Sequence, residues 1–249
     1  SVPVGALVLI ALGRTATLRE AIRSPRMLGM GAVTAGLISI NWGISIWAVN
    51  SGHALDASLG YYINPLFSIL LASVFLGERL SKLQMAAIAL AGVAVAILTI
   101  ESGKFPWVAL SLTVTFGLYA LAKKRLPIGP NQGFLLEVLI LLIPALIYLG
   151  YLSATGQTHF FQGTPFDTWM LFGCGLVTAV PLILYANGAK RLRLSTIGIL
   201  QYIAPTMIFL CAVLVFDEPF GTARMIAFPM IWAALVIYSI SLFRQMRHK

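Results

Sequence analysis

Long apolar runs separated by short polar or charged turns dominate the chain. Roughly 20 apolar residues are needed for a helix to cross a bilayer, and eight runs reach or approach that length. The opening SVPVGALVLIALG is apolar but too short, so we expect it to be the end of a helix that begins before this sequence. The eight runs predict membrane-spanning helices at 27–50, 54–77, 82–101, 106–122, 132–152, 166–188, 195–216 and 224–243.

The composition agrees with this interpretation. Hydrophobic residues make up 59% of the 249 residues and charged residues only 10%, whereas soluble domains carry about 25% charged residues. The mean hydropathy is +0.91. Cys174 and Cys211 lie inside apolar runs, without the spacing of a metal or redox motif. These features predict an all-α polytopic membrane protein.

The basic residues are distributed unequally about the predicted spans. Fifteen of the seventeen Lys and Arg residues fall on one side, and only Lys104 and Arg224 fall on the other. By the positive-inside rule the fifteen are cytoplasmic, and so is the C-terminus. The net charge of +9 is therefore expected to set topology and to contact lipid headgroups. No nucleic-acid partner is expected.

The chain matches itself when it is shifted by 140 residues without a gap. The two copies lie five spans apart, an odd number, so they cross the membrane in opposite directions. Inverted repeats are typical of secondary transporters, in which interrupted helices meet near the bilayer midplane. The matched pairs include Tyr62 with Tyr202, Ile63 with Ile203, Pro65 with Pro205 and Glu78 with Glu218.

Asn64 directly before Pro65 is an unusual feature of the span at 54–77. Proline removes a backbone donor and clashes one turn back, and unpaired polar groups are costly in lipid. One interpretation is a kink whose polar groups are satisfied by neighbouring helices, and the other is a helix that faces a polar cavity. Because Pro205 repeats the break beside Gln201, we favour the cavity.

Two stretches, WAVNSGHALDASLGYYINPL and RLRLSTIGILQYIAPTMIFL, closely resemble the RarD-type permeases. These are the chloramphenicol-sensitive protein group of the EamA family, in the drug/metabolite transporter superfamily. The Gly-Glu and Asp-Glu turns at 77–78 and 217–218 are also typical of EamA repeats. The resemblance implies ten helices in two inverted five-helix repeats, here 1–103 and 104–249, with the first helix and part of the second missing. It also implies a multi-pass protein of the bacterial inner membrane with both termini cytoplasmic.

Polar side chains near the middle of four spans are the candidate solute-binding residues. These spans, at 27–50, 54–77, 166–188 and 195–216, are expected to surround a central cavity, with 82–101 and 224–243 more peripheral. Aromatic rings beside amides can hold an amphipathic solute by stacking and hydrogen bonding. For Tyr185, an anchor at the membrane interface is an equal alternative. The candidates are Asn41, Trp42, Tyr61, Asn64, Tyr185, Gln201 and Tyr202, with Pro65 and Pro205 as helix breaks.

Glu137 is the candidate proton-coupling residue. It lies inside the span at 132–152, with no Lys or Arg nearer in sequence than Arg125. Partial desolvation favours the protonated form of a carboxyl group, so Glu137 is suited to exchange a proton during transport. The alternative is that it only reaches the interface or hydrogen-bonds a neighbouring helix.

The sequence carries no catalytic motif or metal-ligand pattern, so neither an enzyme nor a cofactor is expected. We predict a secondary active transporter that moves a small neutral, zwitterionic or cationic metabolite or drug by alternating access. The alternatives are a phosphate-ester exchanger of the same fold and a non-transporting membrane scaffold or sensor. The expected partners are a small-molecule solute and the lipid bilayer, and a homodimer is left open.

Overall fold

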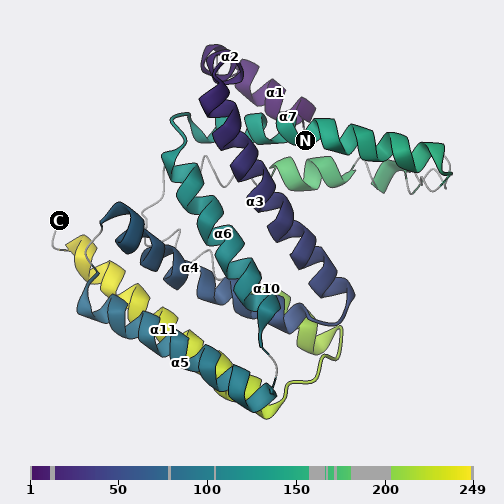
Figure 1. The fold of residues 1–249 in the computed structure, drawn as a ribbon. Coiled ribbons are helices and arrows are strands. Elements are labelled where there is room, and N and C mark those ends of the chain that lie inside the picture. Colours follow the sequence, from purple (N-terminus) through teal and green to yellow (C-terminus); the bar gives the residue numbers. More distant parts are fainter. Residues whose placement is uncertain are drawn as a thin grey trace. The chain divides into compact units, whose positions relative to one another are not determined.

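The computed structural model describes residues 2–11, 15–77, 80–103, 105–156, 166, 168–170, 173–180 and 203–247. In these ranges the regular structure is α-helical, which confirms the predicted fold class. The helices are α1 (Val2–Ala11), α2 (Thr15–Arg23), α3 (Pro25–Asn50), α4 (Ala54–Leu76), α5 (Lys82–Ser102), α6 (Trp107–Arg125), α7 (Pro130–Ala154), α10 (Ile203–Leu214) and α11 (Thr222–Arg247) (Figure 1).

Within the described residues, five helices are long and apolar enough to cross a membrane. They are Pro25–Asn50, Ala54–Phe75, Lys82–Glu101, Asn131–Ala154 and Thr222–Arg244, and they coincide with five of the predicted spans. A sixth predicted span forms α6, which is more polar because it ends in three basic residues. Shorter apolar helices at Thr168–Val180 and Ile203–Leu214 lie within the other two predicted spans. The chain is thus an all-α polytopic membrane protein.

The chain divides into two compact units, each assembled from two separate stretches of sequence. One unit holds Ser1–Gly36 and Ala122–Leu192, and the other holds Leu37–Leu121 and Arg193–Lys249. These units follow packing, whereas the predicted boundary between residues 103 and 104 follows the duplication. The division into two repeats therefore stays a prediction.

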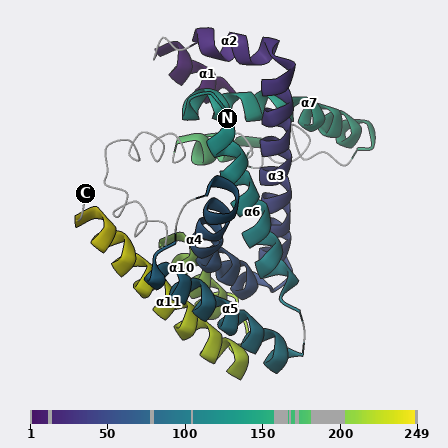
Figure 2. The same ribbon diagram turned by 60° about the vertical axis from the view of Figure 1, so that its left-hand side comes forward.

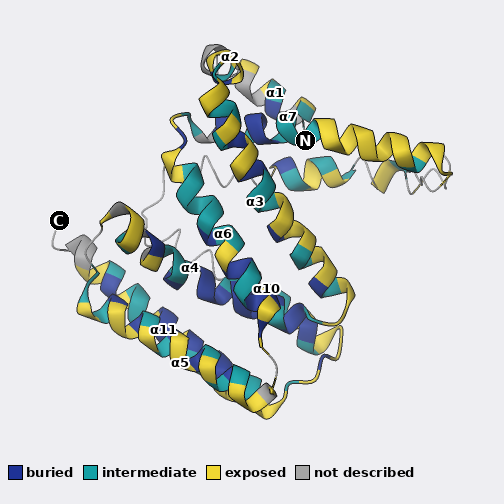
Figure 3. Cartoon of the chain, in the orientation of Figure 1, coloured by how far each residue is buried: buried dark blue, intermediate teal, exposed yellow. Residues whose placement is uncertain are grey.

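In the second unit, α5 and α11 lie side by side along most of their length (Figures 1 and 2). Small residues at helical spacing allow this approach. The alanines that are fully buried between the two helices are Ala87 and Ala94 on α5 and Ala227 and Ala234 on α11. Buried and exposed positions alternate along both helices (Figure 3). The exposed side chains include Ile100 and other apolar residues, as expected for a surface in contact with lipid.

The ends of this helix pair are fixed by local hydrogen bonds. The Ser81 hydroxyl accepts from the Gln84 backbone N–H and the Gln84 side chain accepts from the Ser81 N–H, which forms a capping box at the start of α5. The Ser81 Oγ also lies 2.7 Å from the Ser241 Oγ on α11. At its other end, α5 stops at Gly103, whose φ of 60° suits glycine.

Aromatic rings join α4 to this pair of helices. Phe228 of α11 is 1% exposed, and its ring centroid lies 4.9 Å from Phe209, 5.6 Å from Phe220, 6.1 Å from Tyr62 and 6.2 Å from Trp232. Offset and edge-to-face pairs of this kind stabilise beyond their buried area. Tyr62 therefore places the first half of α4 against α10 and α11.

In the first unit, α1 and α2 pack against α7. The start of α3 also approaches α7 closely, because a Cβ added at Gly31 would lie 2.9 Å from a methyl group of Leu136. The second half of α7 is exposed and apolar, with Ile143 and Ile147 at 65% and 69% exposed. α2 is a short amphipathic helix that the apolar pattern of the sequence did not predict.

Candidate functional site

Asn41 of α3 joins three helices through its side-chain amide. The Nδ2 group donates to the Leu112 carbonyl at 2.9 Å and to the Thr115 Oγ1 at 2.8 Å, both on α6. The Oδ1 atom accepts from the Tyr61 hydroxyl of α4 at 3.3 Å. Asn41 is 0% exposed, so its polar groups are satisfied inside the protein.

α4 and α6 come close together because small residues line their crossing. A Cβ added at Gly60 would lie 2.7 Å from the Ala109 carbonyl oxygen, a contact that real Cβ atoms do not make. The Thr113 hydroxyl donates to the Gly60 carbonyl at 2.9 Å. About two turns further along the same face of α4, Phe67 lies against Gly117. This crossing sets the register of the two helices and hence the position of Tyr61 and Asn64.

Asn64 is also buried, at 6% exposed, but its Oδ1 atom has no hydrogen-bond partner among the described residues. The next residue, Pro65, lies inside α4 and has no backbone N–H, so the helical bond to the Tyr61 carbonyl is missing. Two acceptors therefore lie within one turn of α4 without their ordinary donors. A buried acceptor without a donor costs about 1–3 kcal/mol, which makes this turn of α4 a candidate binding site.

The helix that carries Pro65 contacts the helix that carries its counterpart, Pro205. The Tyr62 hydroxyl of α4 lies 2.7 Å from the Thr206 Oγ1 of α10, and Pro205 is buried. The two helices that match in sequence thus pack against each other in the second unit. Pro65 lies inside α4 and Pro205 lies in the first turn of the described part of α10, so the role of the two prolines as helix breaks stays a prediction.

Glu218 holds the beginning of α4. Its two carboxylate oxygens accept from the backbone N–H groups of Ala54, at 2.6 Å, and Leu55, at 3.0 Å. Beside this contact, the Arg224 guanidinium lies 3.0 Å from the Asp56 carboxylate. Sequence reasoning recognised Glu218 only as a repeat match, because its partners are backbone groups more than 160 residues away.

Glu137 belongs to the first unit. Its sequence context suggested that it has no cation nearby, but the structure places one beside it. Its Oε1 atom lies 2.7 Å from the Lys123 Nζ, and its side chain is 5% exposed. The sequence expectation missed this pair because the turn after Arg125 reverses the chain and places the end of α6 beside the start of α7. Glu137 is therefore a buried carboxylate with an adjacent cation.

The other predicted site residues are placed only in part. Trp42 is 45% exposed. Tyr185, Gln201 and Tyr202 lie outside the described residues. Among the described residues there is no group of three or more His, Cys, Asp or Glu that could hold a metal ion.

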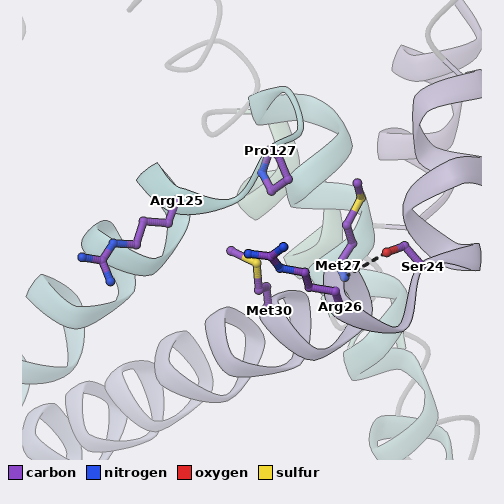
Figure 4. Close-up of a pocket in the computed structure, with 6 residues that line it drawn as sticks. All are labelled: Ser24, Arg26, Met27, Met30, Arg125 and Pro127. Carbon is purple, nitrogen blue, oxygen red and sulfur yellow. Dashed lines mark hydrogen bonds between the residues drawn. The ribbon is translucent and has the colours of Figure 1, made fainter.

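A cavity of about 530 Å³ lies in the first unit, at the beginning of α3 and the end of α6. Figure 4 shows the lining residues, of which Arg26 and Arg125 are basic and Met27, Met30 and Pro127 are apolar. The Ser24 hydroxyl at its edge accepts from the Met27 N–H at 3.4 Å. None of the predicted solute-binding residues that the structure describes, Asn41, Trp42, Tyr61 and Asn64, lines this cavity.

Comparison with known proteins identifies the family. Residues 3–100 match the EamA-like transporter family. Protein RarD of Streptomyces exfoliatus is 43% identical over 99% of this chain and 78% of that protein, and Protein RarD of Escherichia coli is 42% identical over 89% of this chain and 75% of that protein. Chloramphenicol-sensitive protein RarD of Pseudomonas aeruginosa is 33% identical over 95% of this chain and 80% of that protein. No solved structure matches the chain. The chain therefore belongs to the RarD-type permeases of the EamA family, a family of membrane transporters.

Proposed function

We propose that this protein is a secondary active transporter that moves a small neutral, zwitterionic or cationic solute across the bacterial inner membrane by alternating access. The observation that carries the proposal is the buried Asn64 Oδ1 atom next to Pro65, which has no hydrogen-bond partner in the described part of the chain. Lipid cannot satisfy such a group, which is tolerated in a membrane protein where it faces a polar cavity. A solute with an N–H or O–H group would supply the missing donor.

The polarity of this region favours a solute without a strong negative charge. Asn64 presents a hydrogen-bond acceptor. One turn before it on α4, the ring of Tyr61 lies edge-to-face with that of Phe116 on α6, with 6.5 Å between the ring centroids. A phosphate or sulfate group is normally bound by Arg or Lys. Lys123, one of three basic residues at the end of α6, pairs with Glu137, and Arg125 lines a cavity that does not include Asn64. A phosphate-ester exchanger is therefore the less favoured alternative.

The orientation follows from the basic residues. Lys123, Lys124 and Arg125 end α6, and by the positive-inside rule this end is cytoplasmic. α4 then begins on the outer side and ends on the inner side, and the C-terminus is cytoplasmic. This places Asn64, ten residues after the start of α4 at Ala54, about 15 Å from the outer end, near the midplane.

Transport by the purified complete gene product in proteoliposomes tests this proposal. We suggest chloramphenicol as the first probe, because one relative is named for sensitivity to it and because it is a neutral molecule with amide and hydroxyl donors. A hexose phosphate serves as the comparison. We expect saturable movement of the neutral probe, driven by an imposed proton gradient. Tight binding and exchange of the hexose phosphate alone would instead establish the phosphate-ester alternative.

We also propose that Glu137 couples transport to protons through its contact with Lys123. Protonation of Glu137 would break the 2.7 Å ion pair and change the charge balance between α6 and α7. Glu137→Gln keeps the shape and removes titration, so this variant is expected to transport down a solute gradient without concentrating the solute. Glu101→Gln, at an exposed position at the end of α5, is the matched control. Unchanged pH dependence and accumulation in Glu137→Gln would show that Glu137 is structural.

A further inference from the structure

The contact between Glu218 and the start of α4 satisfies backbone groups that an α-helix leaves unpaired. The first four N–H groups of a helix have no intrahelical acceptor, and here Ala54 and Leu55 donate to the Glu218 carboxylate. The contact is charge-assisted and favoured by the helix dipole. Glu218 is 6% exposed, so water competes little for either partner.

The position of Glu218 is fixed from the side of α10. Its backbone N–H donates to the Ala212 carbonyl at 3.0 Å, which closes the end of α10. The preceding residue, Asp217, has a φ of 48°, in the left-handed region that reverses the chain at a helix end. Glu218 is therefore fixed to the end of α10 through its backbone, and its side chain binds the first turn of α4.

Further contacts hold the first half of α4, residues 54–64. Asp56 pairs with Arg224 of α11, and Arg224 also donates to the Pro219 carbonyl at 2.9 Å. Leu55, Leu59 and Tyr62 are at most 2% exposed and belong to the hydrophobic core formed with α5, α10 and α11. Residues 54–64 are thus attached to α10 and α11 by polar contacts at one end and by apolar packing along their length.

The far end of α4 is more exposed than its beginning, although Leu66 and Leu71 after Pro65 are 2% and 8% exposed. Leu70, Val74 and Phe75 are 36%, 68% and 51% exposed. Pro65 removes the hydrogen bond that would join the two halves through the Tyr61 carbonyl. Proline positions are the common sites of helix kinks, and the exposed residues Leu70, Val74 and Phe75 lie one to three turns beyond this one.

We propose that Glu218 is a positioning residue that clamps the first half of α4, so that α4 bends at Pro65 and only its second half moves during transport. Asn64, the last residue before the bend, then stays on the fixed side while the second half changes access to it. The inference rests on the proposed transport function, since it assigns the moving part of that cycle. The clamp itself is a property of the structure and can be measured without transport.

Distances between spin labels test the clamp in the complete gene product in lipid nanodiscs, with Cys174 and Cys211 replaced by Ser. Met225 near the start of α11 and Val74 on the second half of α4 are 58% and 68% exposed, and Ser51 before α4 is also exposed. One label pair is Ser51 with Met225, across the clamp, and the other is Val74 with Met225. A bend of about 20° moves Val74, nine residues beyond Pro65, by roughly 5 Å. We expect two populations for the second pair and one for the first, with and without chloramphenicol.

Glu218→Gln is expected to broaden the distribution of the Ser51–Met225 pair, whereas Asp217→Asn, which removes the neighbouring exposed carboxylate, leaves it narrow. If Glu218→Gln does not fold, Arg224→Gln loosens the same end and should broaden the same pair. Two populations of the Ser51–Met225 pair in the unmodified protein, or no broadening in the variants, overturns the clamp. Two populations of the Val74 pair in a protein that moves no solute would leave the clamp intact and count against the proposed transport function.

Discussion

Asn41 and Asn64 are two buried amides on neighbouring helices of the same unit, and they differ in what surrounds them. Asn41 is 0% exposed and forms hydrogen bonds through both its nitrogen and its oxygen. Asn64 is 6% exposed, and its oxygen has no hydrogen-bond partner within the ranges that the structure describes. Both looked equivalent as polar residues near the middle of a span. Asn41 thus joins α3, α4 and α6, whereas the Asn64 oxygen is the acceptor that we propose a solute completes.

This comparison separates stability from function in chemically identical side chains. A satisfied amide contributes to folding, because removing it leaves its former partners unpaired. An unsatisfied amide weakens folding and persists where a ligand completes it. The two positions should therefore respond oppositely to the same substitution.

The largest effect is expected for Asn41→Leu. The substitution removes the donors to Leu112 and Thr115 and the acceptor for Tyr61, and buried groups without partners cost about 1–3 kcal/mol each. We expect the free energy of unfolding in detergent to fall by about 2–4 kcal/mol. Asn50→Leu, at the exposed end of α3, is the control and should change it little. Unchanged stability of Asn41→Leu would remove the distinction between the two amides.

The next effect concerns the helix crossing that positions both amides. Gly60→Ala would place a Cβ 2.7 Å from the Ala109 carbonyl oxygen, and such overpacking costs about 1–3 kcal/mol. Because backbone atoms cannot move aside easily, α4 and α6 must separate. Gly92→Ala on α5, where an added Cβ meets nothing within 4 Å, is the matched control and should be neutral or slightly stabilising. Equal melting temperatures for both variants would show that the crossing is not tight in the membrane.

Asn64→Leu tests the functional half of the comparison. Losing one hydrogen bond of about 1.4 kcal/mol to the solute lowers transport at limiting solute roughly tenfold. The melting temperature should stay the same or rise, because an unpaired buried oxygen is removed. Transport of chloramphenicol in proteoliposomes and thermal unfolding in detergent are measured on the same preparations. Loss of stability with normal transport per folded molecule would assign Asn64 a structural role instead.

The sequence predicted the helices well because membrane crossing depends on the length of an apolar run, which is a local property. The predicted span 27–50 became Pro25–Asn50, and 132–152 became Pro130–Ala154. Asn64 and Pro65 were also recognisable, because an amide before a proline is costly inside an apolar helix. Local rules therefore identified the candidate site on α4.

The sequence could not show which polar groups have partners, because this depends on the register of packed helices. The Asn41 side chain donates to the backbone carbonyl of Leu112 on α6. Any residue at position 112 would provide that carbonyl. Glu218 binds backbone N–H groups, which leave no trace in residue identity. Lys123 and Glu137 meet because of the turn between α6 and α7. A small residue such as Gly60 indicates that another helix packs closely there, but it does not indicate which helix.

The smallest effect is expected for Tyr61→Phe, which keeps the ring and removes the hydroxyl that contacts the Asn41 Oδ1 atom and the Ser45 side chain. At 3.3 Å the bond to Asn41 is long, so we expect a loss of about 0.5–1 kcal/mol in the free energy of unfolding. The ring keeps its edge-to-face contact with Phe116. Combining Tyr61→Phe with Asn41→Leu should cost less than the sum of the two changes, because both remove the same bond.

The same substitution combined with Asn64→Leu gives the sharper result. Tyr61 and Asn64 have no hydrogen bond in common among the described contacts, so their effects on stability should add to within about 0.5 kcal/mol. Their effects on transport need not add, because the Tyr61 ring and the Asn64 oxygen would contact one solute. Additive stability with non-additive transport would tie both residues to a bound solute. Non-additive stability would mean that the two side chains already interact in the empty protein, and that the Asn64 oxygen is satisfied through Tyr61.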